Sequence, residues 1–172
     1  MTVRYHHHMA LPFDPIEEAA SNWRAKGWDG ISGMQAITSI TRAHQIITAR
    51  INEALAPFDL NLSRFEVLAL LYMSRSRQLP MGKIGERLQV HPASVTNTVD
   101  RLESDKLVTR VAHETDRRTT LARLTADGVQ VIEDAQKVMA AINYGIDGVT
   151  DGARDRITRD LGQLRRSSGD FS

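Results

Sequence analysis

The 172-residue sequence contains no cysteine, few aromatic residues (5%) and a formal net charge of only +1. Without cysteine, the chain has no disulfide scaffold, no cysteine-ligated metal site and no thiol-based redox sensor. No apolar run approaches the roughly 20 residues that a transmembrane helix requires, and residues 1–15 lack the apolar stretch of a signal peptide. Hydrophobic residues make up 41% of the chain, which is enough for a folded core. We therefore expect a soluble, cytoplasmic protein with one domain or two closely fused lobes.

Motifs of the common enzyme classes are also absent. The sequence has no glycine-rich phosphate loop, no Gly-x-Ser-x-Gly nucleophile motif and no His-Glu-x-x-His zinc motif. Acidic pairs such as Asp127 with Glu133 are explained as solvated helix faces. The sequence thus indicates a protein that is not an enzyme, and we expect no cofactor. A metal sensor using His44, His91 and His113 is an alternative, although the His-x3-His spacing of a metal site is missing.

Charge is distributed unevenly along the chain. Residues 63–125 hold 11 basic and 7 acidic side chains, a net charge of +4, whereas residues 1–62 and 126–172 have net charges of −1 and −2. The small total charge excludes a uniformly basic protein. A basic centre between two mildly acidic flanks is typical of a nucleic-acid-binding lobe set within another module.

The first 30 residues form an accessory segment. The tract His6-His7-His8 is interpreted as a tag remnant or a solvated stretch, because three adjacent imidazoles cannot all face one metal ion. A helix is predicted over 16–26, with acidic residues in its first turn, where the helix dipole favours them. Trp23 and Trp28 are the only tryptophans; we favour packing for them over a lid above a ligand pocket.

Hydrophobic periodicity and breaker residues predict the remaining elements. Ser63 and Glu66 form a capping box for the helix that begins there. Thr125 and Thr150 are expected to cap the last two helices, and Pro92 suits the first position of another. The expected helices cover about residues 34–55, 63–71, 83–88, 92–105, 126–142 and 151–164, and strands at 107–112 and 119–124 form a hairpin.

Two short helices joined by a sharp turn and followed by a hairpin make a winged helix-turn-helix. The terminal helices have more apolar surface than so small a lobe can bury, so we expect them to pair with a second copy. The predicted fold class is mainly α (α+β), a winged helix-turn-helix lobe with N- and C-terminal dimerisation helices. The predicted division is an N-terminal extension (1–30), a dimerisation helix (31–62), the DNA-binding lobe (63–125) and C-terminal dimerisation helices (126–172).

The helix expected over 92–105 has the composition of a DNA-reading helix. At 100° per residue its core side carries Val95, Thr98, Val99 and Leu102, and its exposed side carries Ala93, Ser94, Thr96, Asn97, Asp100 and Arg101. Small polar side chains let a helix enter a major groove, and Asn and Arg have the geometry to read adenine and guanine edges. Asp100 is expected to pair with Arg87, Arg101 or a wing arginine, or to accept a bond from cytosine.

The predicted hairpin has a charged tip, Glu114-Thr115-Asp116-Arg117-Arg118. An arginine at the end of a hairpin can reach into a minor groove, where the negative potential is strongest over narrow A·T-rich stretches. An acidic neighbour can hold its guanidinium in place before DNA arrives.

From about residue 31 to residue 164 the chain resembles the MarR (multiple antibiotic resistance regulator) family of bacterial transcription regulators. Residues 63–68 (SRFEVL) are similar to the second helix of the family. Residues 84–88 (IGERL), followed by 94–103 (SVTNTVDRLE), are similar to its helix-turn-helix. Residues 116–118 (DRR), followed by Leu124-Thr125 and Gly128, resemble the wing signature and the start of a dimerisation helix.

The resemblance implies a homodimer with interlocked terminal helices and two winged lobes on a pseudo-palindromic DNA operator. Carried over by position, the residues that would face the major groove are Ser94, Thr96, Asn97 and Arg101. Arg118, beside Arg117, would enter the minor groove, and Asp116 would brace the wing. Lys83 and Arg64 would contact phosphates. His91 departs from the family, because a Ser or Asp cap is the ordinary residue there.

The leading functional hypothesis is a homodimeric DNA-binding regulator, and repression is the favoured sense. A small ligand would bind between the dimerisation helices and the lobe and change the spacing of the two recognition helices. Candidate polar or aromatic ligand contacts are Trp23, Arg42, His44 and Arg50. The alternative is an architectural DNA-binding protein that responds to no ligand.

Overall fold

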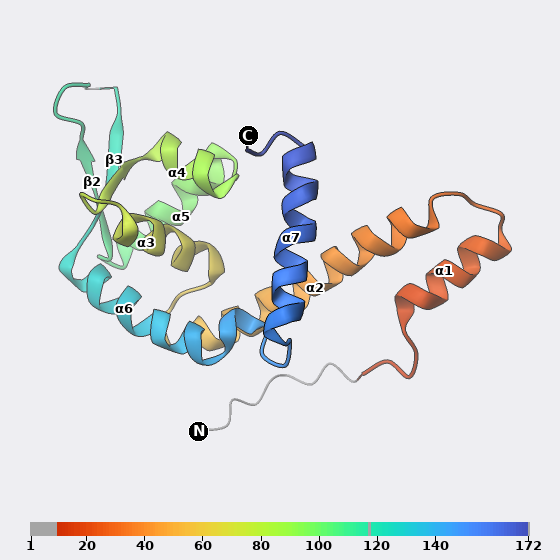
Figure 1. Cartoon of the computed structure of the whole chain (residues 1–172). Coiled ribbons are helices and arrows are strands. Elements are labelled where there is room, and N and C mark those ends of the chain that lie inside the picture. Colours follow the sequence, from red (N-terminus) through yellow and green to blue (C-terminus); the bar gives the residue numbers. More distant parts are fainter. Residues whose placement is uncertain (1–9, 117, 172) are drawn as a thin grey trace.

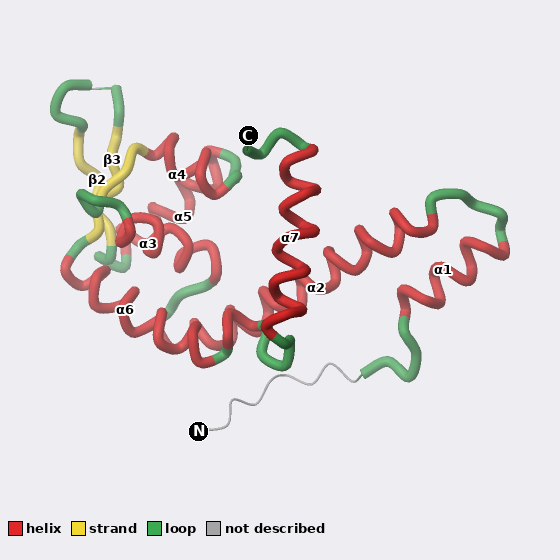
Figure 2. The backbone as a smooth tube through the Cα atoms, viewed as in Figure 1, coloured by secondary structure: helices red, strands yellow, loops and turns green. Residues whose placement is uncertain are grey.

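The computed structural model describes residues 10–116 and 118–171, so that the tract His6-His7-His8 and Arg117 lie outside the described residues. The elements are α1 (Pro15–Ala25), α2 (Ile31–Leu55), the 3-10 helix η1 (Ala56–Phe58), α3 (Leu62–Met73), β1 (Gln78–Pro80), α4 (Met81–Leu88), α5 (Pro92–Ser104), β2 (Val108–Ala112), β3 (Thr120–Leu124), α6 (Ala126–Ala141), the 3-10 helix η2 (Asn143–Gly145) and α7 (Asp151–Ser167) (Figures 1 and 2). This arrangement confirms the predicted mainly helical fold with a winged helix-turn-helix. Within the described ranges, no helix is long and apolar enough to cross a membrane.

One hydrophobic core holds the lobe together. It joins α3, α4 and α5 to the sheet, to α6 and to the C-terminal end of α2. The fully buried large side chains include Leu55, Leu68, Leu71, Ile84, Leu102 and Met139. The three-stranded antiparallel sheet has the order β1-β3-β2, so that the wing strands β2 and β3 are anchored to the lobe through β1.

Helix caps position the lobe, and one predicted cap is wrong. Asn61 caps α3, accepting the backbone N–H of Arg64 at 3.0 Å, and the helix begins at Leu62. Ser63 therefore lies inside the first turn and forms no capping box with Glu66. Asn61 accepts the backbone N–H of Arg64, whereas Ser63 was predicted to accept that of Glu66, so the cap lies two residues earlier than predicted. Thr125 and Thr150 cap α6 and α7 as predicted.

Figure 1 shows α1 folded back along the N-terminal half of α2, away from the lobe. The predicted start of α2 near Met34 is wrong by three residues, because the left-handed Gly30 precedes a helix that already includes Gly33. The rings of Trp23 and Trp28 pack edge to face with their centroids 4.8 Å apart, and Trp28 is 58% exposed. The tryptophans thus pack on each other rather than in the core, and Trp23 Nε1 donates to the carbonyl of Asp29 at 3.1 Å.

The terminal helices leave apolar surface uncovered. Only Ile51, Ala54 and Leu55 of α2 are buried, all in its last turns, and α7 has no buried residue. The exposed large apolar side chains on these two helices are Ile37, Ile40, Ile46, Ile157 and Leu164.

Candidate nucleic-acid interface

Helix α5 presents the predicted polar face to solvent. Val95, Val99 and Leu102 are buried, and Ser94, Thr96, Asn97, Asp100 and Arg101 are exposed. Pro92 begins the helix, and the Nδ1 of His91 accepts the backbone N–H of Ala93 at 3.2 Å. The imidazole of His91 thus caps the helix in place of the ordinary Ser or Asp.

A hollow of about 680 Å³ lies between α4, α5 and the wing. Lys83 of α4, Thr96 of α5 and Arg118 of the wing all line it. The ammonium of Lys83 lies 2.7 Å from Glu86, and both side chains are more than half exposed. Such an exposed pair is worth little in water, so Lys83 is available to a phosphate. The structure therefore brings residues from three elements to one concave surface.

A second hollow of about 370 Å³ lies on the other side of α5, towards the start of α3. It is lined by Asn61, Arg64, Asn97, Thr98 and Arg101. The guanidinium of Arg64 is 3.3 Å from the carboxylate of Asp105. Asn97 and Arg101, the two residues with base-reading geometry, thus share a hollow with a predicted phosphate contact. Ser94 is exposed near the start of α5 and lines neither hollow.

Polar groups of the described wing-tip residues bond to one another. Asp116 accepts the Thr119 hydroxyl at 2.6 Å and the backbone N–H of Arg118 at 3.0 Å. These two hydrogen bonds lower the pKa of Asp116. Among the described residues, the carboxylate therefore braces the turn through a backbone N–H and a threonine hydroxyl, and not through the predicted guanidinium pair. The Nδ1 of His113 adds acceptor contacts of 3.3 Å to the backbone N–H groups of Thr115 and Asp116.

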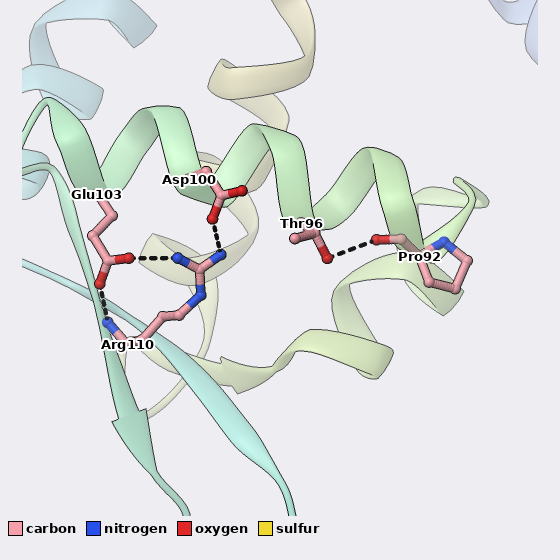
Figure 3. A network of polar contacts seen from close by, with 5 residues as sticks. All are labelled: Pro92, Thr96, Asp100, Glu103 and Arg110. Atoms are coloured by element: carbon pink, nitrogen blue, oxygen red, sulfur yellow. Dashed lines mark hydrogen bonds and ion pairs between the residues drawn. The ribbon is translucent and has the colours of Figure 1, made fainter.

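Asp100 pairs with a wing arginine, which is one of the alternatives that the sequence left open. Arg110 of β2 donates through Nη2 to Asp100 Oδ1 at 2.5 Å and through Nη1 to Glu103 Oε2 (Figure 3). The backbone N–H of Arg110 also donates to Glu103 Oε1 at 3.0 Å. Partial burial lowers the pKa of Arg110, but the bonds to Asp100 and Glu103 raise it, and the net direction is upward.

Sequence reasoning missed Arg110, Glu103 and His113 as parts of this surface. Asp100 and Glu103 are three residues apart and so share one face of α5, which is a signal for a common cationic partner. The local pattern does not indicate which arginine is that partner, because it is the fold of the hairpin that brings Arg110 to this face of α5.

The predicted ligand contacts do not meet in one place. Trp23 lies in the last turn of α1, and Arg50 donates to the carbonyl of Gly145 at 3.1 Å in η2. His44, the third candidate, acts on Glu66 of α3. Burial raises the pKa of Glu66, and the charge of His44 partly opposes that increase. Arg42 lines a hollow of about 270 Å³ between α1 and α2.

The histidines named for a metal sensor also lie apart. His91 caps α5 and His113 caps the wing turn, each through Nδ1. No group of three potential metal-ligating side chains occurs in the stretches 10–116 and 118–171.

Comparison with known proteins places these features in one family. Residues 60–120 match the family model described as the MarR family. The transcriptional regulator MhqR of Bacillus subtilis is 35% identical over 95 residues, which cover 55% of this chain and 64% of MhqR. The matched segment thus spans slightly less than two thirds of that relative.

Solved structures show the same likeness over most of the chain. Sco5413, a MarR family transcriptional regulator from Streptomyces coelicolor, has a TM-score of 0.78 and 42% identity, covering 83% of this chain and 99% of Sco5413. CouR from Rhodococcus jostii, solved bound to p-coumaroyl-CoA, has a TM-score of 0.62 and 25% identity, covering 73% of this chain and 87% of CouR.

Proposed function

The chain belongs to the MarR family of transcription regulators, and we propose that it acts as a homodimeric, sequence-specific DNA-binding repressor whose affinity is controlled by a small molecule. Its relatives are regulators and not enzymes, in agreement with the missing catalytic motifs. A cytoplasmic location, expected from the sequence, fits this role. Residues 63–125 are the proposed DNA-binding lobe, 31–62 and 126–172 the dimerisation helices, and 1–30 an extension added to them.

The observation that carries the proposal is the surface formed by α4, α5 and the wing. Lys83, Thr96 and Arg118 line one hollow, and Asn97 and Arg101 line the other. Cations on the flanks of a polar helix match the charge pattern of a duplex, because phosphates lie on either side of the major groove. We assign Ser94, Thr96, Asn97 and Arg101 to the bases and phosphates of the major groove, and Arg118, with the neighbouring Arg117, to the minor groove.

The exposed apolar faces support the dimer. Ile157 and Leu164 are 51% and 53% exposed on α7, seven residues apart and so on one side of that helix. Pairing with the exposed isoleucines of α2 in a second copy would remove this surface from water, and a closed twofold dimer satisfies both copies at once. Sedimentation velocity should give twice the chain mass of 19.2 kDa. Ile157→Asp should shift the protein towards monomer, whereas Gln163→Asp, on an exposed polar residue of the same helix, should not.

Selection of binding sites from a random DNA library tests sequence-specific recognition. A dimer should enrich a twofold-symmetric site whose half-sites lie about one helical turn apart. Its affinity should fall steeply with salt, because Lys and Arg displace counterions from phosphates. No enrichment, together with equal affinity for all duplexes, would instead support an architectural DNA-binding protein.

Ligand control is tested on the selected duplex. CouR was solved with p-coumaroyl-CoA, so this thioester is one member of a panel of small molecules to be added to the preformed complex. Release of the DNA by one compound identifies the effector class. Arg42→Ala then reports whether the hollow between α1 and α2 contributes, because Arg42 is the cation that lines it.

A further inference from the structure

Arg110 is held between two carboxylates of the recognition helix. Its Nη2 donates to Asp100 and its Nη1 to Glu103, while its backbone N–H donates to the second oxygen of Glu103 (Figure 3). One residue of β2 thus makes three bonds to α5. Because β2 is a strand of the wing, these bonds join the helix that enters the major groove to the hairpin that reaches the minor groove.

The position of Asp100 makes this pairing important for DNA binding. Asp100 lies one turn after Thr96 and three residues after Asn97, and its side chain is 54% exposed. A carboxylate on this face would repel phosphates. Arg110, only 26% exposed, lies directly against it. The guanidinium therefore compensates the charge of Asp100 before DNA is present.

We propose that Arg110 is a positioning residue for DNA recognition, which holds α5 and the wing in a fixed relative placement and neutralises Asp100 without contacting DNA itself. The proposal rests on the proposed DNA-binding function and deepens it. Each terminal nitrogen of Arg110 donates to a carboxylate, so its charge is directed at Asp100 and Glu103, and the residue also lines the hollow between α4, α5 and the wing. A planar guanidinium suits this role, because its rigid geometry directs separate N–H donors to the two carboxylates, whereas an ammonium group is a compact point charge on a flexible stem.

The test measures the affinity of full-length variants by fluorescence anisotropy, on the selected duplex and on a scrambled duplex, at several salt concentrations. The variants are Arg110→Gln, Arg110→Lys and the double variant Asp100→Asn/Arg110→Gln. Arg123→Gln is the matched control, because Arg123 lies on the neighbouring strand and donates to an uncharged group, Gln78 Oε1, at 2.7 Å. Far-UV circular dichroism establishes that each protein is folded at the assay temperature.

Arg110→Gln should weaken binding to the selected duplex at least tenfold and binding to the scrambled duplex less, so that discrimination falls. Arg110→Lys, which keeps the charge but loses the fork, should give an intermediate loss. Adding Asp100→Asn to Arg110→Gln should recover at least threefold, because the uncompensated carboxylate is gone. A merely structural defect at a folded site would not be relieved in affinity by a second lost bond.

Two results would overturn the proposal. The first is an affinity within twofold of wild type for both Arg110→Gln and Arg110→Lys. The second is an equal loss on both duplexes with a salt slope smaller by about one unit and no recovery by Asp100→Asn, which is the behaviour of a direct phosphate contact. Failure of the proposed function itself is recognised separately, because the wild-type protein would then not distinguish the two duplexes.

Discussion

Gly128 lies where the wing joins α6, and replacing it with alanine should destabilise that junction. A Cβ built on Gly128 lies 2.1 Å from the carbonyl oxygen of Leu107 and 2.8 Å from Cδ1 of Leu124. The same oxygen of Leu107 accepts the backbone N–H of Thr125 at 3.1 Å and the Thr125 hydroxyl at 3.0 Å. Because the nearest atom belongs to the backbone, the methyl group must displace either the residue before β2 or the first turn of α6.

The cost follows from these contacts. Overpacking a tight site costs about 1–3 kcal/mol, and weakening two hydrogen bonds adds about 0.5–1.5 kcal/mol each. The better helix propensity of alanine offsets about 1 kcal/mol. The expected net loss is about 1–5 kcal/mol in the free energy of unfolding, which lowers Tm by roughly 2–20 °C for a chain of this size.

Urea and thermal unfolding followed by far-UV circular dichroism measure this loss, at one fixed protein concentration because association affects apparent stability. Gly82→Ala is the control, since no heavy atom lies within 4 Å of the Cβ built there on α4. It should leave the free energy of unfolding unchanged or raise it by up to about 1 kcal/mol. A Gly128→Ala protein that unfolds at the wild-type temperature would refute the close approach of α6 to the wing.

Three further predictions concern the DNA surface. Asn97→Ala should weaken binding to the selected duplex by about 1–3 kcal/mol and relax the preference at one base pair, as read from anisotropy with single-base variants. Arg118→Ala should weaken binding most on duplexes with A·T-rich flanks; an equal loss on G·C-rich flanks contradicts the minor-groove assignment. The bonds from Thr119 and Arg118 lower the pKa of Asp116 below its usual 3.8, so their stabilisation of the wing turn is complete above that pH and is lost as the pH falls through the lowered pKa. Amide exchange at Arg118, whose backbone N–H donates to this carboxylate, should show this loss in an acid titration, and protection that persists after Asp116 is protonated would contradict it.

Signals that act within one or two turns allowed much of the fold to be predicted. Pro92 begins α5, and Thr125 and Thr150 cap α6 and α7, because a proline ring or a hydroxyl acts on backbone groups only a few residues away. The buried side of α5 was also predicted correctly, because the helical period that sets it is a local property of the backbone. The one cap that was misplaced, Ser63 for Asn61, shows the limit of these signals: two adequate capping residues stood two positions apart.

Contacts between distant segments could not be predicted in this way. The register of β2 and β3 determines which side chain of the hairpin reaches α5 and pairs with Asp100. The sequence offers several arginines for that position. The tryptophans had no visible partner in the sequence, and the structure pairs them with each other because Gly27 and Gly30, both at positive φ, turn the chain between α1 and α2. The proposed ligand contacts lie on two helices, Trp23 in the last turn of α1 and Arg42, His44 and Arg50 within residues 42–50 of α2.

The contacts of β2 constrain how a ligand can act on the proposed dimer. Arg110 ties this strand to α5, and the carbonyl of Leu107, directly before it, receives both bonds from the Thr125 cap of α6. The recognition helix, the wing and the start of α6 are therefore joined into one body. We therefore expect a change in the separation of the two α5 helices of the proposed dimer, which must match about 34–36 Å on DNA, to come from movement of these joined segments together rather than from movement between them. A ligand that favours one spacing must bind the two arrangements with different affinity.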